Sequence, residues 1–365
     1  MIGTIPVMRV NYTISQLIGS LLVTERFTLY RERLKEMIRM FFTNDNVLLT
    51  SSARCALYMI VRSLPQHRVV VPAYTCEVVI EAVKLAGKEV VYAQVSKDTL
   101  NIQNYPEIDA NTIVIATHQY GFLSGMEKLA MQCKKKGAVL IEDCAGSLGG
   151  RINGQLTGTF GDYGVFSFSA SKTLQSPTKG GFIIARNKEL LDKIQPITDM
   201  PDDSFVFKIK QIIRAFGFCL AKNKLLSKLL FSKSNSKSEH SETAYLTDTT
   251  YHRSLYEWQA KVLLKQFYNI EALLMERRKL YEKYYNSINN NIIDCKSIKF
   301  GGVCIRFPVL VSDRRRFVEY CRLNHISVGT GYNHLYCPKD FTIAYEISQE
   351  IVYLPFGNGY TEKEK

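Results

Sequence analysis

Residues Gly161–Gly181 read GDYGVFSFSASKTLQSPTKGG. The first part of this stretch has the aromatic and β-branched composition of a buried strand. Small hydroxyl residues follow, then Lys172, and then the pair Gly180-Gly181. Serine and threonine on both sides of Lys172 suggest a partly buried lysine, whose lowered pKa would leave a neutral amine able to attack an aldehyde. A solvated loop lysine is the plainer interpretation of the same residues.

Around this stretch, short apolar runs alternate with helical patterns from about residue 47 to residue 186. The predicted strands are Val47–Thr50, Arg68–Pro72, Glu89–Ala93, Thr112–Thr117, Ala138–Asp143, Tyr163–Phe168 and Gly181–Arg186. The predicted helices between them include Cys55–Ser63, Glu77–Ala86 and Met126–Lys136. Such alternation predicts an α/β fold, in which a mostly parallel sheet is covered by helices and ligands bind in the loops beyond the carboxyl ends of the strands.

The stretch Ala138–Gly150, AVLIEDCAGSLGG, contains a second set of candidate residues where an apolar strand ends on Glu142-Asp143. A carboxylate at that position can pair with a pyridinium nitrogen and keep it protonated, so that the ring withdraws electrons. The small residues Ala145 and Gly146 follow and would let a flat ligand approach closely. Capping of the next turn by Asp143 is the structural alternative. The presence of both Lys172 and Asp143 at neighbouring strand ends favours the first interpretation.

The stretch Leu48–Ile60, LLTSSARCALYMI, combines a strand, a cluster of hydroxyl residues and the start of a helix. Backbone N–H groups at such a helix N-terminus, here at Ala53 and Arg54, can bind a phosphate, and the Arg54 side chain adds a positive charge. Simple capping of the helix by Ser51 or Ser52 is the alternative.

The segment Ser204–Ser238 differs from the rest of the chain because it contains no acidic residue. Its basic residues are Lys208, Lys210, Arg214, Lys222, Lys224, Lys228, Lys233 and Lys237. Within it, apolar residues of Phe205–Phe231 largely follow one helical face, which suggests an amphipathic helical insertion that docks on an anionic surface such as the cytoplasmic membrane face. The alternative is that this stripe packs on the protein's own core or on a dimer partner.

We therefore expect two domains. A large domain over residues 1–250 would include the insertion at about 204–248, and a smaller α+β domain would cover residues 251–365. The smaller domain is predicted to contain a long helical pattern over Leu255–Ile288, a helix at Arg314–Asn324, and strands at Val303–Val311 and Ile351–Pro355. Thr361 is expected to cap a further helix.

The composition argues against several classes of protein. The formal net charge of +13 favours anionic partners, such as phosphorylated small molecules or an acidic membrane face. The nine cysteines are scattered without a CxxC pair, which argues against a disulfide framework or a zinc site and fits a reducing cytoplasm. No stretch reaches the ~18 apolar residues of a membrane-spanning helix. No signature of nucleic-acid binding stands out. We expect a cytoplasmic protein with at most a peripheral contact, through residues 205–231, at the inner membrane face.

From roughly Leu48 onward, the chain resembles the DegT/DnrJ/EryC1/StrS family of pyridoxal-phosphate-dependent sugar aminotransferases, which have the aspartate-aminotransferase-like fold. The family's Phe-Ser-Phe-x-x-x-Lys motif recurs with Ser167 and Lys172, and the resemblance implies that Ser167 binds the cofactor phosphate and that Lys172 forms the Schiff base. The family's strand-end Glu-Asp implies that Asp143 binds the pyridine nitrogen. The His-x-Tyr-Gly turn recurs at residues 118–121, and the Pro-x-x-Thr segment at residues 72–75.

Several family positions hold other residues in this chain. At the cofactor, Ala53-Arg54 replaces a Gly-Thr that grips the phosphate, Cys76 replaces an aromatic that stacks on the ring, and Gly146 replaces a Gln near the phenolic oxygen. Thr178-Lys179 stands where the family often has Gly-Glu. The Asn-Tyr-Arg segment that reaches across the family's homodimer is only echoed by Thr250–Arg253. The resemblance therefore implies the cofactor anchors and a homodimer, but no particular sugar.

The resemblance implies an aminotransferase that uses pyridoxal 5'-phosphate to move an amino group from an amino-acid donor, expected to be glutamate, to a keto sugar on a nucleotide. One alternative is a related keto-sugar dehydratase. Retention of Lys172 argues against it, because the deoxygenating branch of the family has histidine there. The other alternative is a non-catalytic protein of the same fold that acts as a binding or membrane-surface module, which Cys76, Gly146 and the basic segment motivate.

Overall fold

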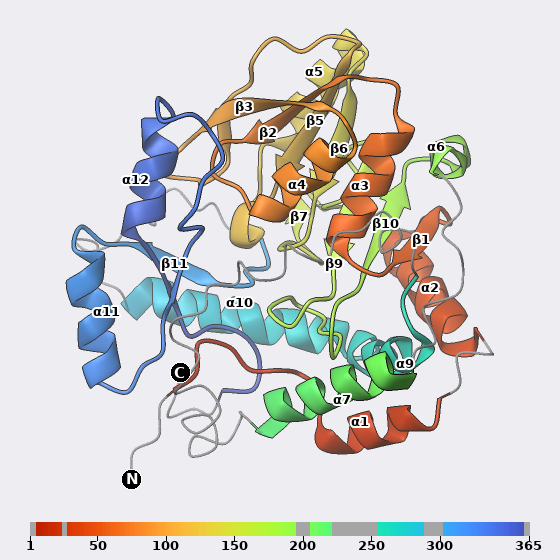
Figure 1. The fold of residues 1–365 in the computed structure, drawn as a ribbon, viewed down its shortest axis with the longest axis vertical. Helices are drawn as coiled ribbons and strands as arrows, with labels where there is room; N and C mark the ends of the chain where they lie inside the picture. The colour runs from red at the N-terminus through yellow and green to blue at the C-terminus, as the bar shows by residue number, and fades with distance from the viewer. Residues whose placement is uncertain (1–4, 24–27, 195–204, 221–253, 288–301, 361–365) are drawn as a thin grey trace.

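The computed structural model describes residues 5–23, 28–194, 205–220, 254–287 and 302–360. An eight-stranded sheet with helices on both faces forms the upper part of the molecule in Figure 1. A three-stranded sheet is formed by strands from the C-terminal part of the sequence, and the long helix α10 (Ile270–Ser287) runs beneath both sheets in this view.

The large sheet is mostly parallel, as predicted. Its strands are, in spatial order, β1 (Val47–Thr50), β10 (Gly181–Ala185), β9 (Tyr163–Ser167), β6 (Val139–Asp143), β5 (Thr112–Thr117), β2 (Arg68–Pro72), β3 (Glu89–Val95) and β4 (Ile102–Asn104). The five strands from β9 to β3 run parallel to one another, whereas β10 pairs antiparallel with both β9 and β1, and β4 pairs antiparallel with β3. The carboxyl ends of β9, β6, β5 and β2 therefore meet at one edge of the sheet.

Both faces of this sheet are buried, which explains why its strands are almost continuously apolar. Val69 and Val71 of β2 pack in one cluster with helices α3 (Ala53–Ser63) and α4 (Glu77–Leu85). Val70, which points the other way, packs in a second cluster with α5 (Met126–Lys136). The three predicted helices are confirmed, with α3 starting two residues earlier than expected and α4 ending one residue earlier.

The predicted long helix over Leu255–Ile288 is wrong in one respect, because two helices are present. They are α9 (Glu257–Phe267) and α10 (Ile270–Ser287). The carbonyl of Asn269 accepts the N–H of Leu273, so the residues between the two helices start a new turn. Asparagine is favoured at such helix starts because its side chain competes with the backbone for hydrogen bonds.

The smaller sheet has the order β11 (Phe307–Leu310), β13 (Ile351–Leu354), β12 (Gly329–Thr330), and helices α11 (Arg314–Leu323) and α12 (Thr342–Glu350) accompany it. The predicted strand Val303–Val311 is shorter than expected. The N–H of Ile305 donates to the carbonyl of Tyr120 at 3.0 Å, so the start of this run pairs with a loop of the large sheet instead of its own sheet. The domain boundary at residues 250 and 251 stays a prediction.

Helices α1 (Ile14–Leu21) and α2 (Leu29–Phe42) precede the sheet and were not predicted. A short hairpin, β7 (Arg151–Ile152) and β8 (Gln155–Leu156), and helix α6 (Lys188–Lys193) complete the large part of the fold. Helix α7 (Phe205–Leu220) confirms a helix in the first part of the range 205–231 and lies beside α1 at the bottom of Figure 1, whereas the interpretation of this segment as an insertion stays a prediction. Residues 221–231 and Thr361 lie outside the described residues.

Candidate active site

Asp143 is the last residue of β6, so its side chain stands at the carboxyl edge of the sheet. It is buried, and its Oδ1 accepts the N–H of Ala145 at 3.1 Å. Burial raises the pKa of the Asp143 carboxyl, whereas the Ala145 N–H and the positive charge of Lys172 act in the opposite direction. Asp143 thus caps the following turn, as the structural alternative predicted. Lys172 is also close enough to favour the ionised form of the Asp143 carboxyl.

Lys172 lies in the loop that follows β9. Its N–H donates to the carbonyl of Ser169 at 3.0 Å, and the N–H of Ser169 lies 3.3 Å from the Oγ of Ser167, which accepts it. Lys172 is partly buried, whereas Lys179 is exposed. Lys172 is therefore favoured over Lys179 as the lysine of the site, because the positive charge of Lys172 acts to lower the pKa of both Asp143 and Cys76.

Arg277 of α10 holds the backbone of Lys172 and was missed by the sequence reasoning. Its Nη2 donates to the Lys172 carbonyl at 3.3 Å, its Nη1 to the Cys304 carbonyl at 3.2 Å, and its Nε to Asn358 Oδ1 at 2.7 Å. Burial lowers the pKa of Arg277 to about 10, which still leaves the guanidinium charged at neutral pH. The signal was available, since Arg277 shares the spacing of the buried residues Leu274 and Leu280 on one face of the helix.

The N-terminus of α3 faces the same edge of the sheet. Ser52 caps the helix by accepting the N–H of Cys55 at 3.1 Å, and Ala53 and Arg54 follow in its first turn. A Cβ at Gly181 would lie 2.8 Å from the nitrogen of Ala53, so this glycine is what lets β10 approach the helix end. The Nη2 of Arg54 lies 3.7 Å from a carboxylate oxygen of Glu81 on α4, which offsets part of the charge that the sequence reasoning assigned to phosphate binding.

Cys76, immediately before α4, is partly buried, and burial raises the pKa of its thiol. Tyr332, from the loop after β12, is a neighbour of Cys76. Burial and this neighbouring thiol together raise the pKa of the Tyr332 hydroxyl well above the ordinary value. The Tyr332 ring stacks on Tyr120 at 5.9 Å and lies 5.1 Å from the ring of Tyr74. The smaller sheet thus supplies an aromatic side chain beside Cys76, which no local sequence pattern indicated.

Gly146 is buried against the turn at residues 118–121. A Cβ on Gly146 would lie 3.0 Å from the nitrogen of Gly121 and 3.3 Å from the carbonyl oxygen of His118. The backbone of this turn therefore occupies the room that a larger residue at position 146 would need. Ala145, between Asp143 and Gly146, is partly buried.

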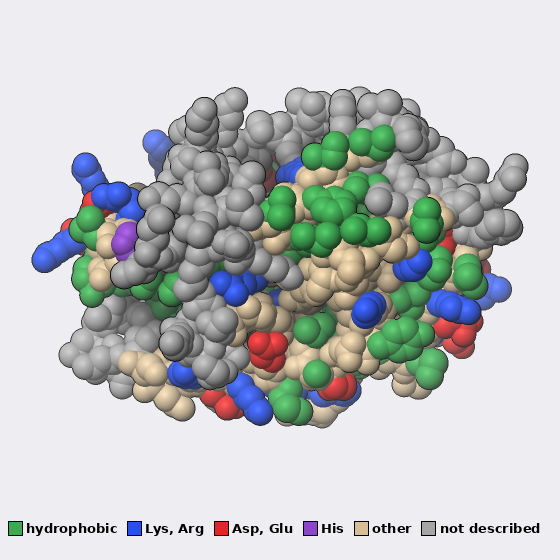
Figure 2. Space-filling model, turned by 90° about the horizontal axis from the view of Figure 1, so that it is seen from below, with side chains coloured by type: hydrophobic (Ala, Val, Ile, Leu, Met, Phe, Trp, Pro, Cys, Tyr) green, Lys and Arg blue, Asp and Glu red, His purple; other side chains and the backbone are tan. Residues whose placement is uncertain are grey.

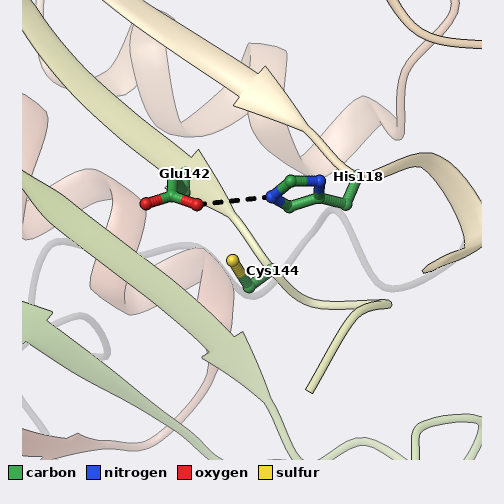
Figure 3. A group of neighbouring side chains, drawn as sticks. All are labelled: His118, Glu142 and Cys144. Atoms are coloured by element: carbon green, nitrogen blue, oxygen red, sulfur yellow. Dashed lines mark hydrogen bonds and ion pairs between the residues drawn. The ribbon is translucent and has the colours of Figure 1, made fainter. Parts of the chain in front are cut away.

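His118, Glu142 and Cys144 lie together next to Asp143, with their ligand atoms within 4.8 Å of one another (Figure 3). Glu142 accepts backbone N–H groups from Gly158 at 2.8 Å, Phe160 at 2.5 Å and Gly161 at 2.8 Å. The Nδ1 of His118 accepts the N–H of Ser124 at 3.1 Å, which puts the proton of a neutral imidazole on Nε2, 3.4 Å from Glu142. Burial raises the pKa of the Cys144 thiol well above its ordinary value. The atoms that could bind a metal therefore already carry protons or make hydrogen bonds. We call the group of His118, Glu142 and Cys144 the clamp, because the hydrogen bonds of Glu142 and His118 hold the end of β6 in place.

The fold and the site together are typical of an α/β enzyme. A lysine and a buried carboxylate lie after adjacent strands, at the edge where such sheets bind ligands. Residues 14–364 match the model of the DegT/DnrJ/EryC1/StrS aminotransferase family, so the chain belongs to this family.

Relatives and solved structures agree with this assignment. The chain is 34% identical over 153 residues to a UDP-N-acetyl-3-dehydro-alpha-D-glucosamine 3-aminotransferase from Acidithiobacillus ferrooxidans, covering 40% of this chain and 41% of that protein. It is 29% identical over 171 residues to a GDP-perosamine synthase from Vibrio cholerae, covering 45% and 46%. The matches thus span less than half the length of these curated relatives. The crystal structure of S. venezuelae DesV in complex with a ketimine intermediate has the same fold, with a TM-score of 0.73 at 18% identity over 100% of this chain and 96% of that one.

Proposed function

We propose that the protein is a pyridoxal-phosphate-dependent aminotransferase whose acceptor is a keto sugar carried on a nucleotide. The observation that supports this most directly is the pairing of the partly buried Lys172 with the buried Asp143 at adjacent strand ends. Family membership supports the reaction class. The names of the relatives, which are aminotransferases or synthases of nucleotide-linked amino sugars, support the acceptor class.

The residues at the strand ends fit this cofactor. Asp143 is a buried carboxyl whose ionised form lacks enough compensation from its surroundings, and a protonated ring nitrogen would provide a positive partner. Buried polar atoms near it also lack hydrogen-bond partners, namely Oγ1 of Thr75 after β2 and both amide atoms of Gln119 after β5. A flat ligand with polar groups on its rim would satisfy such atoms.

The phosphate would bind on the other side of Asp143. Ser167 ends β9, and the N-terminus of α3 follows β1, so both lie on the side of the sheet away from β5. Backbone N–H groups of Ala53 and Arg54 and the Ser167 hydroxyl are suitable donors for a phosphate. We expect the Arg54 side chain to contribute less to phosphate binding than these groups, because it already pairs with Glu81.

When bound, the cofactor would supply an aldehyde that accepts amino groups and a ring that withdraws electrons. Lys172 would hold it covalently and, once the donor's amine displaces it, its Nζ would take the proton from the donor's Cα. Asp143 would keep the ring nitrogen protonated, which stabilises the negative charge that develops at Cα. Arg277 would fix the backbone from which Lys172 reaches, and Cys76 with Tyr332 would cover the ring.

The test is a visible absorption spectrum of the purified protein loaded with pyridoxal 5'-phosphate. We expect a band that glutamate shifts as the cofactor takes up the amino group, and that a nucleotide-linked keto sugar then restores. A panel of such sugars identifies the acceptor. A loaded protein whose band is unchanged by every amino-acid donor would instead support the non-catalytic alternative.

We also propose a homodimer with its active sites near the interface, on the basis of the family resemblance and the preference of oligomers for two-fold symmetry. Light scattering coupled to gel filtration is expected to give twice the chain mass of 41.7 kDa. Full activity in a species shown to be monomeric contradicts this proposal.

Finally, we propose that the protein is cytoplasmic and contacts an anionic membrane through α1 and α7. No helix among the described residues is both long and apolar enough to span a membrane. Part of the apolar stripe of α7 packs inward, with Ala215 and Cys219 in one cluster with Leu17 of α1. Ile212 packs in another cluster with Trp258, whereas other apolar side chains described on α7 are exposed, and Figure 2 shows hydrophobic side chains gathered on this face of the molecule. Among the described side chains, the exposed aliphatic residues are Ile14 and Ile18 of α1, Leu22 at its C-cap, and Ile209, Ile213 and Leu220 of α7.

Co-sedimentation with anionic vesicles tests this contact. We expect binding at low salt that weakens at high salt, because surface charges are screened. A double variant, Ile18→Ser with Ile213→Ser, is expected to lose binding, and Met131→Ser, an equally exposed position on α5, is the control. Absence of binding at low salt, or unchanged binding of the double variant, leaves packing within the protein or its dimer as the role of the stripe.

A further inference from the structure

The side chain of Gln119 is buried and lacks the hydrogen bonds that an amide needs. Gln119 starts the short 3-10 turn Gln119–Gly121 directly after β5 and is 1% exposed. Its backbone N–H donates to Asn101 Oδ1 at 3.0 Å, but neither Nε2 nor Oε1 of its side chain has a hydrogen-bond partner. A buried amide without partners is unfavourable in the free protein, and in native structures such a group calls for an explanation, for example a ligand that supplies the missing bonds.

The turn that holds Gln119 is fixed next to Asp143. The N–H of His118 donates to the Asp143 carbonyl at 3.1 Å, and the N–H of Gly121 donates to the His118 carbonyl at 3.0 Å. Tyr120 has a left-handed backbone, with φ 54° and ψ 12°, which is rare for a residue with a bulky side chain and is maintained only where the surroundings enforce it. The contact of this turn with Gly146 leaves it no room to move toward that segment.

The order of the strands determines which edge of the proposed cofactor faces Gln119. In the sheet, β6 with Asp143 lies between β9 on one side and β5 on the other. Ser167 and the N-terminus of α3, the phosphate donors of the proposed function, lie on the β9 side. With Asp143 at the ring nitrogen and Lys172 at the opposite end, the ring edge away from the phosphate faces the β5 turn. In pyridoxal phosphate, that edge bears the phenolic oxygen.

We propose that the Gln119 amide donates a hydrogen bond from Nε2 to the phenolic oxygen of the cofactor, which makes it a binding residue that tunes the charge on the ring. This inference rests on the proposed function. The hydroxyl of Tyr332 also lies near Gln119, and burial, which raises the pKa of that hydroxyl, is partly opposed by the amide. Tyr332 would therefore lie beside the same edge of the ring.

The Gln119→Leu variant tests the inference, because leucine keeps the size of the side chain and removes both polar atoms. A donor to the phenolic oxygen favours its negatively charged form, so its loss is expected to raise the pH midpoint of the visible absorption band by about one unit. The dissociation constant of pyridoxal 5'-phosphate is expected to rise about 10-fold. In Gln119→Glu, whose carboxylate repels the same oxygen, the midpoint is expected to move further in the same direction.

Thermal unfolding without cofactor separates this role from a structural one. Since the amide makes no hydrogen bond in the free protein and only lies near the Tyr332 hydroxyl, the melting temperature of cofactor-free Gln119→Leu is expected to equal or exceed that of the wild type. Gln94→Leu, on β3 and away from Asp143, is the matched control and should leave both the midpoint and the dissociation constant unchanged.

Two outcomes overturn the inference, and they are distinguishable. If the wild type binds pyridoxal 5'-phosphate but Gln119→Leu has the same midpoint and the same dissociation constant, Gln119 does not contact the phenolic oxygen and the proposed function is untouched. If the wild type itself binds no pyridoxal 5'-phosphate, the proposed function fails and this inference fails with it.

Discussion

At the scale of single residues, the chain offers two lysines close together in sequence, and only one has the surroundings of a reactive amine. Lys172 is partly buried and acts on Asp143 and Cys76, whereas Lys179 is exposed. We predict that Lys172→Ala abolishes both the visible band of the bound cofactor and amino transfer. Lys179→Ala is expected to keep at least about half of the activity, as surface substitutions usually do. Loss of the band in Lys179→Ala but not in Lys172→Ala would reverse the assignment.

The burial of the Asp143 carboxyl lowers the stability of the free protein at neutral pH. Its pKa in the folded state is raised above the ordinary 3.8 by burial, so the folded chain binds more protons than the unfolded chain between the two pKa values. Stability then falls as the pH rises through that window and stays low above it. We predict that Asp143→Asn, which removes the charge, raises the melting temperature of the cofactor-free protein at pH 7 by about 2 °C or more.

The same substitution is expected to slow amino transfer about 100-fold or more, because a neutral amide cannot keep the ring nitrogen protonated. Asp340→Asn, at an exposed position, is the control for both measurements. A melting temperature that drops in Asp143→Asn, or a near-normal single-turnover rate, contradicts the role given to this carboxylate.

At the scale of elements, the end of β6 depends on the clamp around Glu142. The Glu142 carboxylate accepts three backbone N–H groups from residues 158–161 and faces His118 Nε2. In Glu142→Gln, one of these donors would face an NH2 group instead of an oxygen. We predict a loss of about 3 kcal/mol in the free energy of unfolding, measured by urea denaturation at pH 7. The exposed Glu107→Gln should change it by less than about 0.5 kcal/mol. Equal effects in the two variants would mean that the clamp does not stabilise this strand end.

The parallel strands were predictable because each is apolar on both faces and ends at a turn. Arg68–Pro72 and Thr112–Thr117 have the predicted bounds, β6 ends on Asp143 as expected, and the antiparallel strand Val47–Thr50 also has its predicted bounds. The division between α9 and α10 was missed because the apolar spacing continues across it, from Phe267 to Ile270 and Leu274. The shortening of β11 could not be predicted, since it depends on the bond between Ile305 and Tyr120, 185 residues apart in the numbering.

The candidate site was predictable to the same extent. Lys172 and Asp143 belong to local motifs at strand ends, and the family resemblance added Ser167, so the sequence could propose all three as candidates. Tyr332 and Arg277 come from elements far along the chain, and only the packing of the smaller sheet and α10 brings them to the site. Gln119 is part of a quoted motif, but its role depends on burial and on missing partners, which a sequence does not contain.

At the scale of the whole molecule, a single buried cation connects the lysine loop to the C-terminal part of the chain. Arg277 donates to the carbonyls of Lys172 and Cys304 and to the side chain of Asn358, which lie in three separate segments. Removing it takes one hydrogen-bond donor away from each of these three acceptors. We predict that Arg277→Met lowers the free energy of unfolding by about 3 kcal/mol, measured by urea denaturation of the cofactor-free protein.

The same variant should also loosen the attachment of Lys172, because its backbone would lose the bond that holds the loop. We expect the dissociation constant of pyridoxal 5'-phosphate to rise at least about 5-fold, measured at a temperature where the variant is still fully folded. Arg277→Lys keeps the charge but cannot reach three acceptors at once, and it is expected to fall between the wild type and Arg277→Met. The exposed Arg315→Met is the control. If Arg277→Met unfolds more easily but binds the cofactor as tightly as the wild type, Arg277 supports the fold alone, and the position of Lys172 is set by its own loop.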